Sequence, residues 1–238
     1  MTDTKLVSVS DQLSTIARVF AKDGEDFTSM YQKRAIALFD KAMKFGFDAG
    51  FLELVYVPAA KDYGFETLLG KLHEVRVASG YKGSGHWKWE PLWGNKADVH
   101  GGYGLENEVQ LFTLLQGDSI NGLFCTNMDS HEQVKKSKEL FNRNEGTTWL
   151  SPAAYICTQI IRAYERKNLL DCIETDSFSH DGYTETRFLW YGDEGGFIEM
   201  AGGQGVPVAC VDHGGQISLD SSSGIADPCG GPRFVVGE

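Results

Sequence analysis

The sequence lacks the features that mark membrane-spanning, secreted and fibrous proteins. No apolar run approaches the roughly 18–20 residues that a membrane-spanning helix needs. Residues 1–20 contain no apolar core of the kind that a secretory signal peptide has. The five cysteines are odd in number and form no Cys-x-x-Cys pair, which favours free thiols in a reducing compartment. We therefore expect a cytoplasmic protein that does not enter a membrane.

Basic residues are also scarce. The chain has 22 Lys and Arg against 33 Asp and Glu, a formal net charge of −11. Nucleic-acid binding needs clustered Lys and Arg, and the main basic stretch, 135–167, is interspersed with glutamates. From residue 184 onward the only basic residues are Arg187 and Arg233. The composition thus predicts no nucleic-acid partner, and an acidic C-terminal part that suits a basic partner, a metal ion or simply solubility.

The hydrophobic pattern separates a helical part from a strand-rich part. Periodicity and capping residues predict helices at about 8–20, 26–45, 65–72, 129–142 and 151–172. Short β-rich runs predict strands at 51–57, 74–78, 184–191, 197–201, 206–211, 216–219 and 233–236. The stretch 106–116 fits either a helix or a buried strand, and 122–127 is typical of extended chain. Glycine-rich loops at 192–196 and 212–215 suit hairpins.

These elements predict an α+β fold rather than alternating α/β. The N-terminal two-thirds is helix-rich with a few strands, and a C-terminal antiparallel β meander follows it. With 238 residues and 42% hydrophobic residues, the chain can bury a core without disulfides. We expect a single domain over residues 1–238, and if the chain divides, the boundary falls near 144–152.

A Gly-Asp-Ser-Ile-Asn-Gly segment at 117–122 follows the apolar run 111–115. It resembles the first block of the GDSL (SGNH) hydrolases, in which a serine lies on a turn directly after a strand. Such a turn exposes the hydroxyl beside backbone N–H donors. The resemblance implies that Ser119 is the attacking nucleophile of a hydrolase. The alternative is a polar turn, which Asp, Asn and Gly favour by themselves.

The bases for such a nucleophile must come from elsewhere in the chain. The GDSL family also has a late Asp-x-x-His motif, which this sequence lacks, and its serine block lies near the start of the chain rather than in the middle. Here His180 and His213 are the candidate bases, with Asp212 or Asp181 to orient them. Each histidine lies in a glycine-rich loop, so both are equally consistent with ordinary turns.

The same loops offer weak candidates for a divalent metal. Asp98 and His100 lie in a third glycine-rich loop, and three such loops meeting in one cleft would hold a Zn²⁺ or Fe²⁺ ion. No recognised metal-ligand spacing is present. A divalent cofactor therefore stays a hypothesis that composition allows and no motif requires.

Three of the five tryptophans, Trp87, Trp89 and Trp93, lie within seven residues. In an extended segment Trp87 and Trp89 share one face. Exposed, they would form a platform for a substrate ring or an anchor for a partner protein. Buried, they would be core residues of an edge strand.

Two functions of different classes remain. The first is a hydrolase of a small molecule, with a Ser/His/Asp or metal-assisted site in a cleft between the helical and the β part. The second is a non-catalytic acidic interaction protein, such as an immunity-type factor or a component of a virion or larger complex. It would bind a protein partner through the tryptophan-rich patch. The sequence does not specify the oligomeric state.

Overall fold

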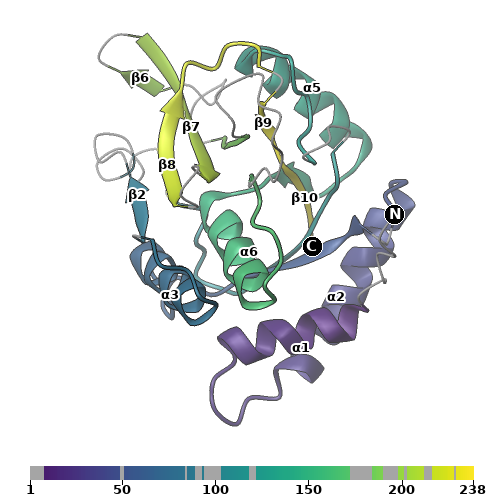
Figure 1. The fold of residues 1–238 in the computed structure, drawn as a ribbon. Helices are drawn as coiled ribbons and strands as arrows, with labels where there is room; N and C mark the ends of the chain where they lie inside the picture. Colours follow the sequence, from purple (N-terminus) through teal and green to yellow (C-terminus); the bar gives the residue numbers. More distant parts are fainter. Residues whose placement is uncertain are drawn as a thin grey trace, which may run out of the picture.

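The computed structural model describes residues 8–48, 51–83, 85–88, 93, 103–117, 122–171, 184–189, 198–200, 203–211, 216–227 and 229–238. Its helices are α1 (Val9–Phe20), α2 (Phe27–Lys44), α3 (Phe65–Ala78), α5 (Ser130–Arg143) and α6 (Pro152–Tyr164) (Figure 1). Its strands are β1 (Glu53–Val57), β2 (His86–Lys88), β3 (Gln110–Leu114), β4 (Thr147–Trp149), β5 (Glu185–Arg187), β6 (Ile198–Met200), β7 (Gly203–Val211), β8 (Ile217–Ser222), β9 (Gly230–Pro232) and β10 (Phe234–Gly237). The predicted α+β class is confirmed.

Side-chain caps begin α1, α5 and α6 where the sequence predicts them. The Ser8 side chain accepts a hydrogen bond from the Asp11 backbone N–H at 3.1 Å. Asp129 and Glu132 form a reciprocal capping box at the start of α5. Ser151 caps α6, with a proline at its first position. Each cap satisfies backbone donors that the first turn leaves unpaired and contributes about 1 kcal/mol.

The strands form two sheets. Each sheet contains strands from the helix-rich N-terminal part and from the strand-rich C-terminal part. The first has the order β1-β3-β10-β4 with antiparallel pairs throughout. The second has the order β2-β8-β7-β5-β9, and β6 pairs with β7. In the C-terminal part β6, β7 and β8 form antiparallel hairpins, whereas β9 pairs with β5 in parallel. The parallel pairing of β2 with β8 and the insertion of β10 between β3 and β4 join the two parts.

The core lies between the first sheet and the helices around it. Tyr56 of β1 contacts Phe20, Phe27 and Tyr31 of α1 and α2, with ring centroids 5.4, 4.9 and 5.7 Å away. Each such buried side chain stabilises the fold by about 1.5–3 kcal/mol. Helix α6 crosses the middle of the molecule beside α3 (Figure 1), and most of its residues are buried. This central helix places its C-terminal end next to the start of β1.

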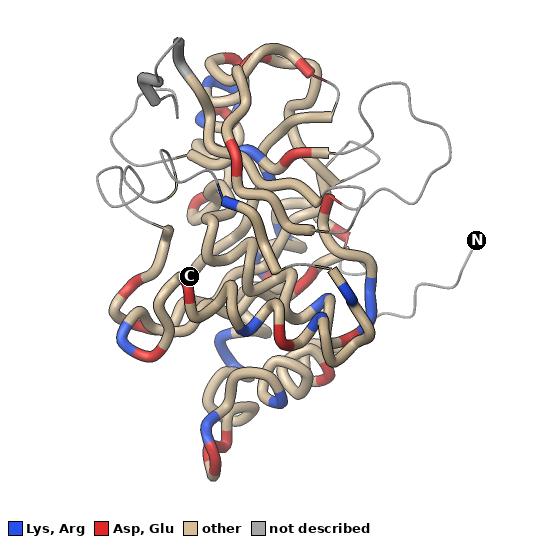
Figure 2. The backbone as a smooth tube through the Cα atoms, turned by 60° about the vertical axis from the view of Figure 1, so that its left-hand side comes forward, with Lys and Arg blue, Asp and Glu red and all other residues tan. Residues whose placement is uncertain are grey.

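Acidic and basic positions are interspersed over the described backbone instead of separating into two halves (Figure 2). None of the described helices is both long and apolar enough to cross a membrane.

The strand predicted at 74–78 is wrong, because these residues form the second half of α3. The alternating valines Val75 and Val77 suggested a strand. The buried positions Leu68, Leu69 and Leu72 instead continue at helical spacing to Arg76. Helix α3 packs against α6, and this packing favours the helix over the strand.

The predicted extent of the helix from 151 to 172 is also wrong, since α6 ends at Tyr164. Arg166 adopts a left-handed φ of 55°. Its N–H bonds to the Ala163 carbonyl, and the Lys167 N–H bonds to the Arg162 carbonyl. This is a Schellman turn, a helix end that usually uses glycine. Arginine at this position gave no sequence indication of the stop.

In the middle of the chain, the structure shows the conformation of two stretches, 106–116 and 122–127. The ambiguous stretch 106–116 contains β3. Residues 122–127 form turns rather than the predicted extended chain, and Cys125 and Asn127 have φ values of 52° and 59°. Hydrogen bonds to residues 227 and 232 hold these turns against the C-terminal part.

Candidate functional site

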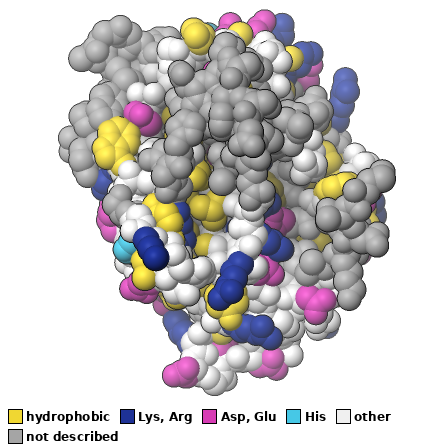
Figure 3. Space-filling model, in the orientation of Figure 1, with side chains coloured by type: hydrophobic (Ala, Val, Ile, Leu, Met, Phe, Trp, Pro, Cys, Tyr) yellow, Lys and Arg dark blue, Asp and Glu magenta, His cyan; other side chains and the backbone are white. Residues whose placement is uncertain are grey.

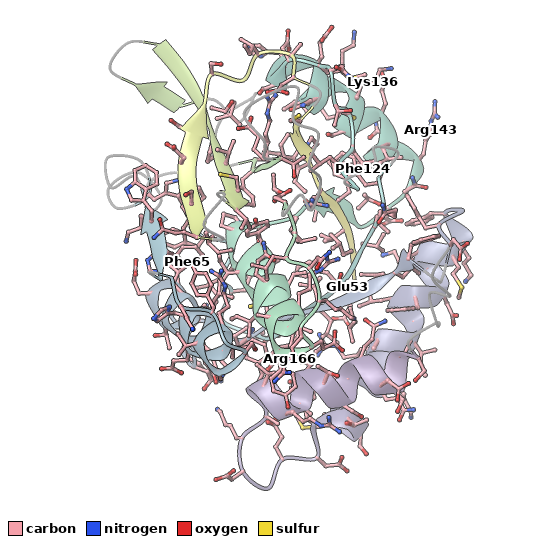
Figure 4. The ribbon with its side chains drawn as sticks, viewed as in Figure 1. Glu53, Phe65, Phe124, Lys136, Arg143 and Arg166 are labelled. Carbon is pink, nitrogen blue, oxygen red and sulfur yellow. The ribbon has the colours of Figure 1, made fainter. Side chains whose placement is uncertain are left out.

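A polar cavity of about 240 Å³ opens where the helical and strand-rich parts meet. We name it the Asp171 cavity. Its described walls come from Phe51 and Glu53 at the start of β1, residues 114–116 at the end of β3, Arg162 of α6, residues 168–171, Thr184 and Arg233. Figure 4 shows Glu53 beside α6, on the side away from Phe65 of α3. Cavities that join several elements in this way are the usual place for a small-molecule site.

The floor of the cavity is a buried hydrogen-bonded ion pair. Arg233 Nη2 lies 2.7 Å from Asp171 Oδ1, and both side chains are almost fully buried. Thr186 Oγ1 donates to Asp171 Oδ2 at 2.7 Å and accepts from Arg233 Nε at 2.9 Å. Thr184 Oγ1 donates to Asp171 Oδ1 at 3.2 Å. Buried charges are tolerated only when paired and hydrogen-bonded in this way, so the network holds the Asp171 carboxylate in one position.

The backbone of Asp171 is strained. Its φ of 62° lies in the left-handed region, where a residue with a Cβ is disfavoured by about 1 kcal/mol or more. The network described above compensates for this cost. Strained backbone conformations cluster at functional sites, and this one supports a role for Asp171.

A fully buried hydroxyl lies near the same carboxylate. Tyr155 of α6 has no exposed surface, and its Oη makes no hydrogen bond of normal length with a described residue, although Asp171 is close enough to interact with it. Burial and then the negative charge of Asp171 raise the pKa of Tyr155 well above its ordinary value of 10. The phenol therefore stays protonated and is a potential donor toward the cavity floor.

A second ion pair forms one wall. Arg162 Nε and Nη2 donate to the Glu53 carboxylate at 3.0 and 2.6 Å, and Arg162 Nη1 donates to the Asn168 carbonyl at 3.1 Å. Both side chains keep some exposure to the cavity. Bidentate pairs of this kind are stronger and better oriented than single contacts.

Two segments that carry predicted site residues begin and end at this cavity. Ser119 lies in 118–121, between Gly117 and Gly122, and the Gly117 N–H bonds to the Gly122 carbonyl at 3.0 Å. A Cβ on Gly122 would lie 3.2 Å from Arg233 Nη1, so this end of the segment touches the cavity floor.

His180 lies in 172–183, directly between the cavity residues Asp171 and Thr184.

The segment that holds Asp212 and His213 begins close by. It follows Val211 of β7, and the neighbouring Cys210 pairs with Glu185, the residue after Thr184. Continuing this register places Val211 opposite Thr184.

The predicted catalytic residues themselves lie outside the described residues. This holds for Ser119, His180, Asp212 and His213, for Trp89, and for the metal candidates Asp98 and His100. Of the residues that the structure describes, no group of three or more His, Cys, Asp or Glu side chains is placed to hold a metal ion.

The two described tryptophans of the Trp-rich segment have different environments. Trp87 lies on β2 and is 43% exposed. Trp93 is fully buried, stacks with Tyr103, and donates from Nε1 to the Asp220 carbonyl at 2.9 Å. Trp93 is thus a core residue that contacts β8. It is buried, as one alternative from the sequence expected, but it lies outside the strand β2.

Sequence reasoning missed the charged residues of the cavity. Glu53 and Arg162 lie on a strand and a helix that it predicted, but no sequence pattern marked either residue as part of a site. The available signal was weak: Asp171 closes the apolar run Leu169–Leu170, and Arg233 opens the last strand. Charged residues embedded in apolar runs are buried only when paired, yet the sequence does not name the partner.

Two other cavities are weaker candidates. A largely apolar one of about 350 Å³ lies between Phe112, Phe141 and Trp149. An open one of about 260 Å³ lies at the C-terminal ends of α3 and α6, lined by Arg76 and Arg166. Figure 3 shows Lys and Arg side chains on the lower part of this face, and Figure 4 shows Arg166 below α6. Basic residues at helix C-termini have a structural explanation in the helix dipole.

Comparison of the chain with protein-family models, with curated proteins and with solved structures found no match in any of the three.

Proposed function

We propose that this protein is a hydrolase whose small-molecule substrate occupies the Asp171 cavity. One observation carries the proposal: separate chain segments, bearing Ser119 and His180, start and end at one polar cavity between the helical and β parts. The start of the Asp212–His213 segment, close to Thr184, adds support. Chain segments held at their ends by a rigid scaffold are where catalytic groups most often lie.

In the proposed reaction Ser119 Oγ attacks the acyl or phosphoryl centre of the substrate, and His180 or His213 takes the serine proton. The leaving group receives that proton as its bond breaks. Water then attacks the covalent intermediate and gives a proton to the same base. The base returns this proton to Ser119 Oγ as the bond to the serine breaks and the acid product leaves. Asp212 or Asp181 orients the base. A water held by a divalent metal is the alternative attacking group.

A broad screen with ester and phosphate-ester substrates tests the proposal, followed by single substitutions. Ser119→Ala is expected to lower kcat by at least about 10³-fold, because the attacking atom is lost. Its thermal unfolding temperature is expected to stay within about 1 °C of the parent, since the proposed role of the hydroxyl is in the reaction and not in holding the fold.

Ser29→Ala, at an exposed serine of α2, is the matched control and is expected to leave kcat unchanged. Parent-like turnover in Ser119→Ala, together with parent-like turnover in both His180→Ala and His213→Ala, would reject the serine mechanism. Absence of any turnover in the screen would reject the hydrolase.

The non-catalytic interaction protein is the second candidate, and the exposure of Trp87 favours it. This indole lies on β2, which pairs with β8 and ends the strand order of the second sheet. An exposed tryptophan is a typical anchor in protein interfaces. A chain that hydrolyses nothing, and whose Trp87 emission shifts when a basic protein partner is added, would fit this candidate instead.

We also propose that the protein works in the reducing cytoplasm. The described cysteines Cys125, Cys157, Cys210 and Cys229 are all free thiols. Labelling of purified protein with a maleimide before and after denaturation would show whether they are reduced when isolated.

A further inference from the structure

We infer that the Asp171 cavity takes a neutral, hydroxyl-rich ligand of the sugar class. The inference deepens the proposed function, because it rests on that function in placing the substrate in this cavity.

The charge balance of the cavity disfavours an anionic ligand. Each described arginine that lines it already faces a carboxylate, Arg162 with Glu53 at 2.6 Å and Arg233 with Asp171 at 2.7 Å. An anion would have to displace one of these partners and leave a carboxylate unpaired in a largely buried position. Breaking a buried ion pair in this way is strongly unfavourable. A cationic ligand would have to displace an arginine from its carboxylate and leave that arginine unpaired, which is unfavourable for the same reason.

The polarity of the lining also disfavours an apolar ligand. Covering two ion pairs with hydrocarbon would remove water from charged groups and return no hydrogen bonds. A hydroxyl group both donates and accepts, so it can bind to a carboxylate, a guanidinium or an amide without changing the net charge. Gln116 and Asn168, both exposed at the cavity, each present an amide donor and an amide acceptor.

One aromatic side chain completes the arrangement. Phe51, at the entrance of β1, lines the cavity and is 56% exposed, a high value for a phenylalanine. The C–H face of a sugar ring is apolar and would cover this ring while its hydroxyls reach the polar groups. The cavity volume of about 240 Å³ lies below the roughly 300–1,000 Å³ of sites for drug-sized molecules. It therefore suits one sugar unit, free or within a longer chain.

Matched sugars that differ only in charge test this inference. The parent protein is titrated to about 10 mM, a range that detects weak millimolar binding. The neutral probes are glucose, galactose, N-acetylglucosamine and maltose, and the charged probes are glucose 6-phosphate and glucuronate. The readout is the nuclear magnetic resonance shift of the Gln116 and Asn168 side-chain amides. At least one neutral sugar is expected to shift both amides saturably and to bind more tightly than either charged probe.

Phe51→Ala is expected to weaken that sugar about threefold to tenfold, the usual contribution of an aromatic contact. Met30→Ala is the matched control, because Met30 of α2 is similarly exposed but does not line the cavity. The inference is overturned if no neutral sugar shifts the two amides, if a charged probe binds more tightly, or if Phe51→Ala binds like the parent.

These outcomes separate the inference from the proposed function. A sugar that binds at the cavity but is never hydrolysed in any glycoside or ester would keep the inference and reject the hydrolase. Hydrolysis of a phosphate ester that competes with no sugar would keep the hydrolase and reject the inference.

Discussion

At the scale of single residues, the cavity floor depends on one threonine. The Thr186 hydroxyl joins Asp171 to Arg233, since it donates to the first and accepts from the second. It satisfies two charged groups that are almost fully buried. The Tyr155 hydroxyl, also buried, makes no hydrogen bond of normal length with a described residue, although Asp171 is close enough to interact with it. We therefore expect the Thr186 hydroxyl to stabilise the fold and the Tyr155 hydroxyl to destabilise it.

We predict that Thr186→Val lowers the free energy of unfolding by about 1–3 kcal/mol, because it removes one hydrogen bond from each of two buried charged groups. Tyr155→Phe is expected to raise it by about 1 kcal/mol, because the substitution removes an unsatisfied buried hydroxyl and little volume. Urea unfolding of both variants and the parent measures the two changes. A destabilised Tyr155→Phe would show that the hydroxyl has a partner, such as a buried water.

At the scale of elements, two helices end in the same backbone turn with different residues. The Tyr81 N–H bonds to the Arg76 carbonyl at the end of α3, and the Lys167 N–H bonds to the Arg162 carbonyl at the end of α6. The left-handed residue is Gly80 in the first turn and Arg166 in the second. Glycine adopts this conformation without a steric cost, whereas arginine does not.

Substitutions at Arg166 and Gly80 are expected to change the free energy of unfolding in opposite directions. We predict that Arg166→Gly stabilises the fold by about 0.5–1 kcal/mol and that Gly80→Ala destabilises it by about 1 kcal/mol. No heavy atom lies within 4 Å of a Cβ built on Gly80, so the second effect comes from the backbone alone. Thermal and urea unfolding measure both changes. A destabilised Arg166→Gly would mean that contacts of the arginine side chain stabilise the fold by more than its left-handed backbone costs.

Helix beginnings could be predicted from the sequence because their cause is local. Ser8, Asp129 and Ser151 each satisfy backbone donors within three residues of themselves. The second half of α3 and the end of α6 were missed for the opposite reason. Contact with α6 fixes the first, and a left-handed arginine that no propensity favours fixes the second.

At the scale of the whole molecule, strand order and the cavity could not be predicted from the sequence. β10 was expected in a C-terminal meander, but it lies between β3 and β4, about 120 and 90 residues earlier in the chain. Lys41 Nζ donates to the Gly237 carbonyl at 2.9 Å, and Arg34 binds the Glu238 side chain at 2.5 Å, so α2 also holds this segment. The same long-range pairing brings Arg233 to Asp171 and creates the cavity floor.

The candidate site was therefore predictable in part only. The polar turn at 117–122 and the histidine loops are local features that the sequence displays, whereas their relation to one cavity follows from strand order. The resemblance of Ser119 to a nucleophile stays a prediction, and the proposed function depends on the cavity that its segment meets.

Closing the mouth of the Asp171 cavity tests the central claim most directly. Asn168→Trp places an indole at an exposed wall position, and Asn107→Trp does the same at an exposed position of a separate cavity near Arg34. With the substrate that the screen identifies, we predict that Asn168→Trp lowers kcat/KM at least about 100-fold while Asn107→Trp leaves it unchanged. Unfolding temperatures close to the parent value confirm that both variants are folded. Parent-like kcat/KM in a folded Asn168→Trp would contradict the account, because the substrate would then be transformed somewhere else.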